Sequence, residues 1–260
     1  MRWFRRLAVS AALLYSGAAL FIFLAQDALI FHPGERQLAQ CNLPEGVEHW
    51  AHGGERGLLT SAGHSKLLVF FHGNADDACN WRFLGVNHLH KLGFDVLVVE
   101  YAGYGGDTRT PSKASIDVAV HAAADWQETR GYEHVVAMGY SLGTGAASLF
   151  TVAANADQTV LFAPYDSIYN VAWASGMIFP RMLLKSDFDN LVALQSTDAT
   201  IHIIHGERDR VIPAQFSAAL RDGLLAAGRT VSRRELAGVN HHGLFDSPRF
   251  DVIMAEILGG

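Results

Sequence analysis

Cysteine, metal-binding motifs and an excess of basic charge are all missing or scarce in this sequence. Only two cysteines, Cys41 and Cys79, occur in 260 residues, which excludes a framework of several disulfides. The thirteen histidines are scattered, and no Cys/His cluster or His-Glu-x-x-His motif has the spacing of a zinc site. We therefore expect neither a metal nor another cofactor.

The charge balance also narrows the range of partners. A formal net charge of −6 provides no basic stripe for a phosphate backbone, so nucleic acid is not expected as a partner. Half of the residues are apolar, which is enough to bury a sizeable core. The length beyond residue 30 suits one mid-sized domain rather than two.

The two cysteines leave two interpretations open. In an oxidising compartment Cys41 and Cys79 could form a disulfide. Alternatively, Cys79 is a small buried side chain on a helix and Cys41 lies in a loop.

The first 30 residues have the pattern of a membrane anchor. Three arginines, at positions 2, 5 and 6, precede an uncharged run from Leu7 to Gln26. A helix of about 20 residues spans roughly 30 Å, the hydrocarbon thickness of a bilayer. A cleaved signal ending at Ser16-Gly17-Ala18 is the alternative, but the apolar run continues beyond it. Either interpretation predicts that the following domain lies on the extracytoplasmic side, because the arginines hold the N-terminus inside.

Downstream of the anchor, short apolar runs alternate with segments of helical periodicity, a pattern that predicts strands and helices in turn. Residues 31–55, rich in Gly, Pro and charge, predict a linker and an irregular first hairpin. The predicted strands are 66–71, 95–100, 134–138, 159–162, 201–205 and 230–236. The predicted helices are 78–92, 112–129, 143–154, 213–227 and 250–258.

This alternation predicts an α/β fold, a mostly parallel sheet with helices on both faces. Functional sites in such folds gather at the carboxyl ends of the strands. Residues 163–200 are longer than one crossover requires, and their aromatic and methionine content predicts short helices that partly cover those strand ends.

The Gly139-Tyr140-Ser141-Leu142-Gly143 motif marks Ser141 as a candidate nucleophile. It follows a predicted strand and opens a predicted helix, the strand–turn–helix setting that the Gly-x-Ser-x-Gly motif needs. Small flanking residues allow the sharp turn, and the Leu142 amide at the helix start can stabilise an oxyanion. The alternative is that the two glycines only allow close packing.

A second oxyanion donor is expected on the loop after strand 66–71, where His72-Gly73-Asn74 follows. Gly73 would let the backbone turn so that the Asn74 amide faces the site. For His72 we expect a structural role, in which the ring braces the loop rather than transferring protons.

The acid and base candidates follow in the chain order Ser, Asp, His. Asp209 lies in HGERDRVIP at the carboxyl end of strand 201–205, where a carboxylate can orient a histidine. Asp166, after strand 159–162, is the rival acid. The base must come after the last strand, which leaves His241 and His242, and the spacing from Gly238 favours His241.

Together these features resemble the α/β-hydrolase superfamily, and within it the membrane-anchored ABHD-type serine hydrolases. The resemblance covers nearly the whole chain and lies in LAQDALIFHPG, FFHGNA, YAGYGG, GYSLGTG, SDFDNL, IIHGERDRVIP and GVNHHGLF. It implies an anchor at residues 1–30 and an α/β-hydrolase catalytic domain at 31–260 with a short lid at 163–200.

The resemblance also implies a Ser141–Asp209–His241 triad with an oxyanion hole from the Asn74 and Leu142 amides. The implied reaction is hydrolysis of an ester, thioester or amide through an acyl-enzyme, and we expect an ester or thioester of a small-molecule or lipid-like acyl group as the substrate. Two departures are His242, where relatives often carry an acidic or amide residue, and the shortness of residues 163–200.

Other functions stay open on the same fold. A peptidase or amidase would need an acidic cluster for a free amino group, and none is evident in residues 163–200. A dehalogenase or epoxide hydrolase would carry Asp in place of Ser141. A non-catalytic hydrolase fold that acts as a binding protein usually lacks a triad member.

Overall fold

A single β-sheet forms the centre of the protein. The structure is a computed structural model and describes residues 2–245 and 249–259. Within these residues, eight strands form one sheet in the order β1-β2-β4-β3-β5-β6-β7-β8. β1 and β2 run antiparallel to their neighbours, and all pairings from β4 to β8 are parallel. The predicted α/β fold is confirmed. The strands are β1 (Val47–His52), β2 (Glu55–Thr60), β3 (Lys66–Phe71), β4 (Phe94–Glu100), β5 (His134–Tyr140), β6 (Gln158–Phe162), β7 (Thr200–Gly206) and β8 (Val231–Leu236).

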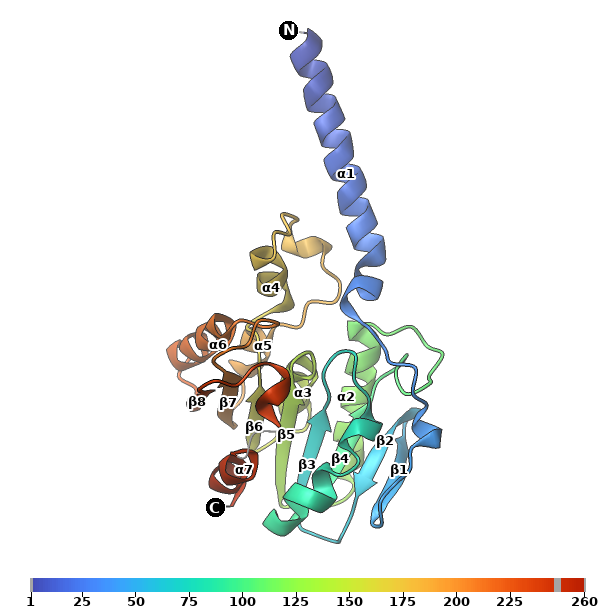
Figure 1. Ribbon diagram of the computed structural model, residues 1–260, viewed down its shortest axis with the longest axis vertical. Coiled ribbons are helices and arrows are strands. Elements are labelled where there is room, and N and C mark those ends of the chain that lie inside the picture. Colours follow the sequence, from blue (N-terminus) through green and yellow to red (C-terminus); the bar gives the residue numbers. More distant parts are fainter. Residues whose placement is uncertain (1, 246–248, 260) are drawn as a thin grey trace.

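Helices cover both faces of the sheet, and each face has its own core (Figure 1). One core contains α2 (Lys113–Glu128), α3 (Gly143–Ala153) and α6 (Ala214–Ala226). The other contains α7 (Phe250–Leu258) and the segment 78–92. Because successive side chains of a strand point to opposite faces, β3 supplies residues to both cores and is buried almost throughout.

The prediction of one helix over residues 78–92 is wrong. The chain forms a 3₁₀ turn (Ala78–Trp81), a π turn (Gly85–Leu89) and a second 3₁₀ turn (His90–Leu92). The backbone at Gly85 lies against Thr60, where an added Cβ would come within 2.5 Å of the hydroxyl oxygen. This close packing against β2 favours a local distortion over a regular helix.

The first hairpin is more regular than the sequence predicts. β1 and β2 pair over six residues each, and β2 continues well beyond Glu55. Gly53 and Gly54 form the connecting turn with φ of 58° and 83°. Two central residues with positive φ are the turn geometry that matches the twist of paired strands.

The N-terminal helix α1 (Arg2–Ile30) is a candidate membrane span, since its most apolar 18 residues have a mean hydropathy of 2.2 and none of them is buried. It projects away from the body (Figure 1). The segment 163–200, called the lid segment below, contains α4 (Ile168–Ala174), a 3₁₀ turn (Arg181–Leu183) and α5 (Asn190–Leu194). The predicted short helices are therefore present.

Candidate active site

Ser141 lies on a strained turn between β5 and α3. Its φ is +52°, a left-handed conformation that costs a non-glycine residue about 1–2 kcal/mol. Hydrogen bonds hold the turn: the Ser141 amide donates to the Phe162 carbonyl at 2.9 Å, and the Thr144 hydroxyl donates to the Ser141 carbonyl at 2.6 Å. The turn therefore fixes the direction of the serine side chain.

The flanking glycines are required by close packing. A Cβ at Gly139 would lie 2.5 Å from the Gly143 carbonyl oxygen, and one at Gly143 would collide with the carbonyl oxygens of Phe71 and His72. The start of α3 thus lies directly against the end of β3. Close packing therefore places the turn beside the β3 loop, and the role of Ser141 as nucleophile stays a prediction.

His241 joins the serine to a carboxylate. Its Nε2 lies 3.0 Å from Ser141 Oγ, and its Nδ1 lies 2.6 Å from Asp209 Oδ2. All three residues are buried. Because the carboxylate accepts a hydrogen bond from Nδ1–H, Nε2 is left free to accept the serine proton.

Asp209 is held as an anion by several donors. Its Oδ1 accepts from the amides of Val211 and Ile212, both at 2.9 Å. Burial alone would raise the pKa of Asp209, but hydrogen bonds from His205 and His241 outweigh it and hold the pKa well below the usual range. A carboxylate that stays ionised can stabilise an imidazolium on His241.

His205, whose role the sequence analysis did not assign, is a second histidine at Asp209. Its buried Nε2 lies 2.8 Å from the Ile212 carbonyl oxygen and 3.3 Å from Asp209 Oδ2. Both neighbours accept hydrogen bonds, so the Nε2 proton is shared between them. The signal for this contact was the spacing of His205 and Asp209 at the end of β7.

The two rival residues lie elsewhere. The Asp166 carboxylate accepts a hydrogen bond from the Asn170 side chain. His242 is exposed, and its ring centre lies 5.3 Å from that of His241. The geometry therefore brings together Ser141, Asp209 and His241.

The loop after β3 lies beside the serine turn. A Cβ at Gly73 would lie 3.0 Å from the Tyr140 ring. Gly73 has no positive φ; the left-handed residue of this loop is Ala75, at φ +53°. The glycine therefore makes room for Tyr140, and the direction of the Asn74 amide stays a prediction. Tyr140 in turn donates from its hydroxyl to the His241 carbonyl at 3.0 Å.

The Asn74 side chain has a role that the sequence did not indicate. Its Oδ1 accepts from the Tyr104 hydroxyl at 2.7 Å and from the His32 amide at 2.9 Å. Its Nδ2 donates to the Ile30 carbonyl at 2.5 Å. Asn74 thus ties the candidate oxyanion loop to the end of α1.

The expected bracing role of His72 agrees with its contacts. Its Nε2 lies 2.9 Å from Glu100 Oε1 and its Nδ1 lies 2.9 Å from the Gly73 carbonyl oxygen, all fully buried. Both partners accept, so both ring nitrogens carry protons. Burial lowers the pKa of His72, but the Glu100 carboxylate outweighs it and the pKa is raised. Glu100 was not identified from the sequence, although a carboxylate at the end of the buried strand β4 indicates a buried polar contact.

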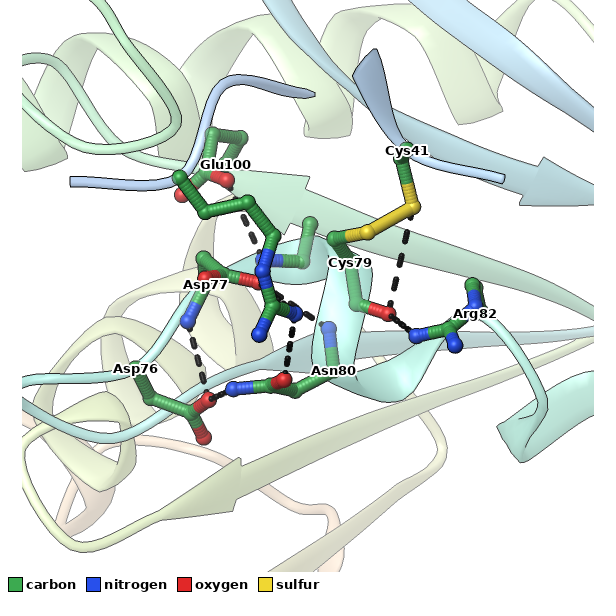
Figure 2. Close-up of a disulfide and its surroundings, with 9 residues drawn as sticks. Cys41, Asp76, Asp77, Cys79, Asn80, Arg82 and Glu100 are labelled. Carbon is green, nitrogen blue, oxygen red and sulfur yellow. Dashed lines mark hydrogen bonds and ion pairs between the residues drawn. A yellow bond between two sulfur atoms is a disulfide. The ribbon is translucent and has the colours of Figure 1, made fainter. Parts of the chain in front are cut away.

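Cys41 and Cys79 form a disulfide, which decides the question left open by the sequence (Figure 2). Cys79 is also buried in the short turn after the candidate oxyanion loop. Next to it, the Asp77 side chain accepts from the Asn80 amide at 3.0 Å, and Glu100 accepts from the Ala78 amide at 3.1 Å. The disulfide and these bonds fix the far end of the loop.

Comparison with known proteins agrees with this fold. Residues 66–194 match the model of the α/β hydrolase fold family. The uncharacterized protein Rv2307c of Mycobacterium tuberculosis is 30% identical over 244 residues, which cover 89% of this chain and 85% of that protein. The chain belongs to the α/β hydrolase fold family.

Two relatives with assigned names are of the ABHD type. The human protein ABHD12B is 26% identical over 75% of this chain and 60% of its own length. The bovine lysophosphatidylserine lipase ABHD12 is 24% identical over 74% of this chain and 56% of its own length. This chain therefore spans little more than half the length of these two relatives, and it is a hydrolase that resembles them.

Solved structures show the same fold at low sequence identity. The Pyrococcus furiosus esterase PF2001 superposes with a TM-score of 0.68 at 14% identity, over 88% of this chain and 98% of that one. Thermogutta terrifontis esterase 2, phosphoramylated by tabun, gives a TM-score of 0.61 at 15% identity, over 83% of this chain and 96% of that one.

Proposed function

We propose that this protein is a serine hydrolase that cleaves carboxylic ester or thioester bonds through an acyl-enzyme. The observation that carries the proposal is the position of His241, 3.0 Å from Ser141 Oγ and 2.6 Å from Asp209 Oδ2. These distances are within the range over which a base takes a proton from a nucleophile while a carboxylate orients it.

In the proposed reaction, Ser141 Oγ attacks the acyl carbonyl carbon as His241 Nε2 takes its proton. The tetrahedral intermediate collapses when His241 returns that proton to the leaving alcohol or thiol, which leaves the acyl group on Ser141. Water then attacks with His241 as the base, and the carboxylic acid is released. Asp209 stabilises the imidazolium in both steps.

The amides of Asn74 and Leu142 are the proposed oxyanion donors. Leu142 precedes the first residue of α3, where amides point out of the helix and favour negative charge. Asn74 is fixed from its side chain by Tyr104 and the end of α1. Donors that are already in place need no reorganisation as charge develops on the substrate oxygen.

We propose a lipid-like acyl substrate and a single-pass membrane anchor. The name of the bovine relative, a lysophosphatidylserine lipase, supports a lipid ester. The apolar α1 supports the anchor, and the arginines that precede its apolar run support a catalytic domain on the extracytoplasmic side.

A fluorophosphonate probe tests the nucleophile. The wild type is expected to be labelled and to cleave a p-nitrophenyl acyl ester, whereas Ser141→Ala should do neither and should keep its circular dichroism spectrum. Ser196→Ala, at an exposed serine, is the matched control and should behave as wild type. Labelling and ester turnover that persist in Ser141→Ala would place the nucleophile elsewhere. Faster cleavage of aminoacyl anilides than of esters would favour a peptidase instead.

A further inference from the structure

Part of the lid segment, α4 and the loop that follows it, stands above the body of the domain beside α1, whereas α5 lies within the body (Figure 1). Near the end of α1, the Gln26 side chain donates to the Leu183 carbonyl at 3.0 Å. Three turns further from the body, the Tyr15 hydroxyl donates to the Ile178 carbonyl at 3.3 Å, and the Tyr15 ring stacks on Phe179. The tip of the lid segment therefore reaches the middle of the candidate membrane helix.

Charges on α1 define where a bilayer would lie. Between Arg6 and Asp27, α1 carries no charged residue and extends about 32 Å, which matches the hydrocarbon thickness. At the domain end, the Asp27 carboxylate accepts from the Ser186 hydroxyl at 2.7 Å and lies 4.0 Å from Lys185 Nζ. Tyr15 lies about 18 Å along the helix from Asp27, close to the centre of that interval.

The part of the lid segment that lies at the level of Tyr15 has no charged side chains and several exposed apolar ones. Residues 171–180, which reach the level of Tyr15, contain no charged side chain. Trp173 and Ile178 nevertheless have 54% and 65% of their surface exposed. The first charged residue beyond this stretch, Arg181, pairs with Asp187 and Asp189 on the lid segment itself. Large apolar side chains that are exposed next to an apolar helix indicate a shared apolar environment.

Several backbone groups at the tip are paired within the protein. The amide of Met177 donates to the Ala172 carbonyl at 3.0 Å, and that of Ser175 donates to the Val171 carbonyl at 3.1 Å. The Ser175 hydroxyl donates to the same Val171 carbonyl, and Tyr15 satisfies the Ile178 carbonyl. Internal pairing of polar groups is what hydrocarbon demands of any segment that enters it.

We propose that residues 171–180 form a re-entrant element immersed in the lipid acyl chains of the leaflet next to the catalytic domain, alongside α1. The inference rests on the proposed membrane anchoring by α1. The Asn74–Ile30 bond places the loop beside Ser141 at the end of α1. The immersed element therefore holds the carboxyl ends of the strands, where Ser141 lies, against the bilayer surface. Lipid esters reach the site from that leaflet.

Fluorescence quenching by lipids tests this placement. Ile178→Cys introduces a free thiol, since Cys41 and Cys79 are paired. The thiol is labelled with an environment-sensitive nitrobenzoxadiazole dye, and the full chain is reconstituted in phosphatidylcholine vesicles with nitroxide-bearing acyl chains. Control labels are placed at Leu20 on α1 and at Val118 on α2, which are 58% and 53% exposed.

The expected result is blue-shifted emission and strong nitroxide quenching at residues 178 and 20, with water-like, unquenched emission at residue 118. Quenching at residue 20 but not at 178 would overturn the re-entrant element while leaving the anchor intact. Absence of quenching at both positions would overturn the anchor and the inference with it. Blue-shifted emission at residue 178 without quenching would mean that other protein, such as a second copy of this chain, covers the tip. That result would also overturn the proposal.

Substrate preference gives an independent measurement. Ile178→Asp places a charge at the tip, and we expect a loss of about tenfold in turnover of a vesicle-borne ester, because charge is expelled from hydrocarbon. Turnover of soluble p-nitrophenyl acetate should be unchanged. Val118→Asp, at a similarly exposed position, is the control and should affect neither substrate. An equal loss on both substrates in Ile178→Asp would contradict a role at the membrane.

Discussion

Replacing Glu100 by Gln removes the charge that faces the His72 imidazolium while leaving the size of the side chain nearly unchanged. Glu100 Oε1 accepts from His72 Nε2 at 2.9 Å, and Oε2 accepts from the Ala78 amide at 3.1 Å. A carboxamide has only one oxygen, so its amino group must face either His72 or the Ala78 amide. While His72 keeps both ring protons, one buried contact is then a donor against a donor, and its relief requires His72 to lose the Nε2 proton and the positive charge with it.

The expected magnitude follows from the burial of this pair, since neither side chain is exposed to solvent. Breaking a buried ion pair by removing one partner costs about 3–5 kcal/mol in the free energy of unfolding. For a domain of this size, that cost lowers Tm by about 6–20 °C. The same contacts hold both ends of the loop that carries Asn74, so we also expect turnover to fall by about 10- to 100-fold.

Thermal unfolding followed by circular dichroism and steady-state ester hydrolysis measure the two effects. Glu48→Gln, which removes the same charge from an exposed position on β1, should change neither. If Glu100→Gln melts like the wild type and turns over ester at the same rate, the pair does not brace the loop and this reasoning fails.

Three further predictions concern pH, the disulfide and close packing. Because the pKa of His72 is raised above 6.5, the stability contributed by its pair is fully present below that pH and is lost as pH rises through the raised pKa. Urea titrations should therefore show the difference in unfolding free energy between wild type and Glu100→Gln narrowing as pH is raised from neutral, and a constant difference would contradict this. Cys79→Ser opens a cross-link between residues 38 apart and should cost about 4 kcal/mol in urea unfolding, with dithiothreitol producing the same loss in the wild type but none in the variant. Gly143→Ala drives a methyl group into carbonyl oxygens at the end of β3 and should abolish ester turnover, whereas Gly34→Ala meets nothing within 4 Å and should be neutral.

The alternation of apolar runs and helical segments was sufficient to predict the fold, because parallel strands are buried on both faces and leave a strong signal. The motif around Ser141 was equally informative, since a sharp turn against β3 admits only glycine at positions 139 and 143. Local geometry of this kind depends on a few adjacent residues, so the sequence predicts it.

Contacts between distant residues could not be predicted in the same way. The pairing of Cys41 with Cys79 depends on how a loop and a turn approach each other. The distortion that keeps residues 78–92 from forming one helix depends on the approach of Gly85 to Thr60 on β2. The bond between Asn74 and the end of α1 likewise has no local signal.

The central proposal is that Ser141 carries the acyl group, and mass spectrometry of a trapped intermediate tests it most directly. The wild type is mixed with a p-nitrophenyl ester, quenched in acid within one turnover, digested and sequenced. The proposal predicts one added acyl group on the peptide that contains Ser141, at the serine oxygen. An acyl group found on another side chain would contradict it.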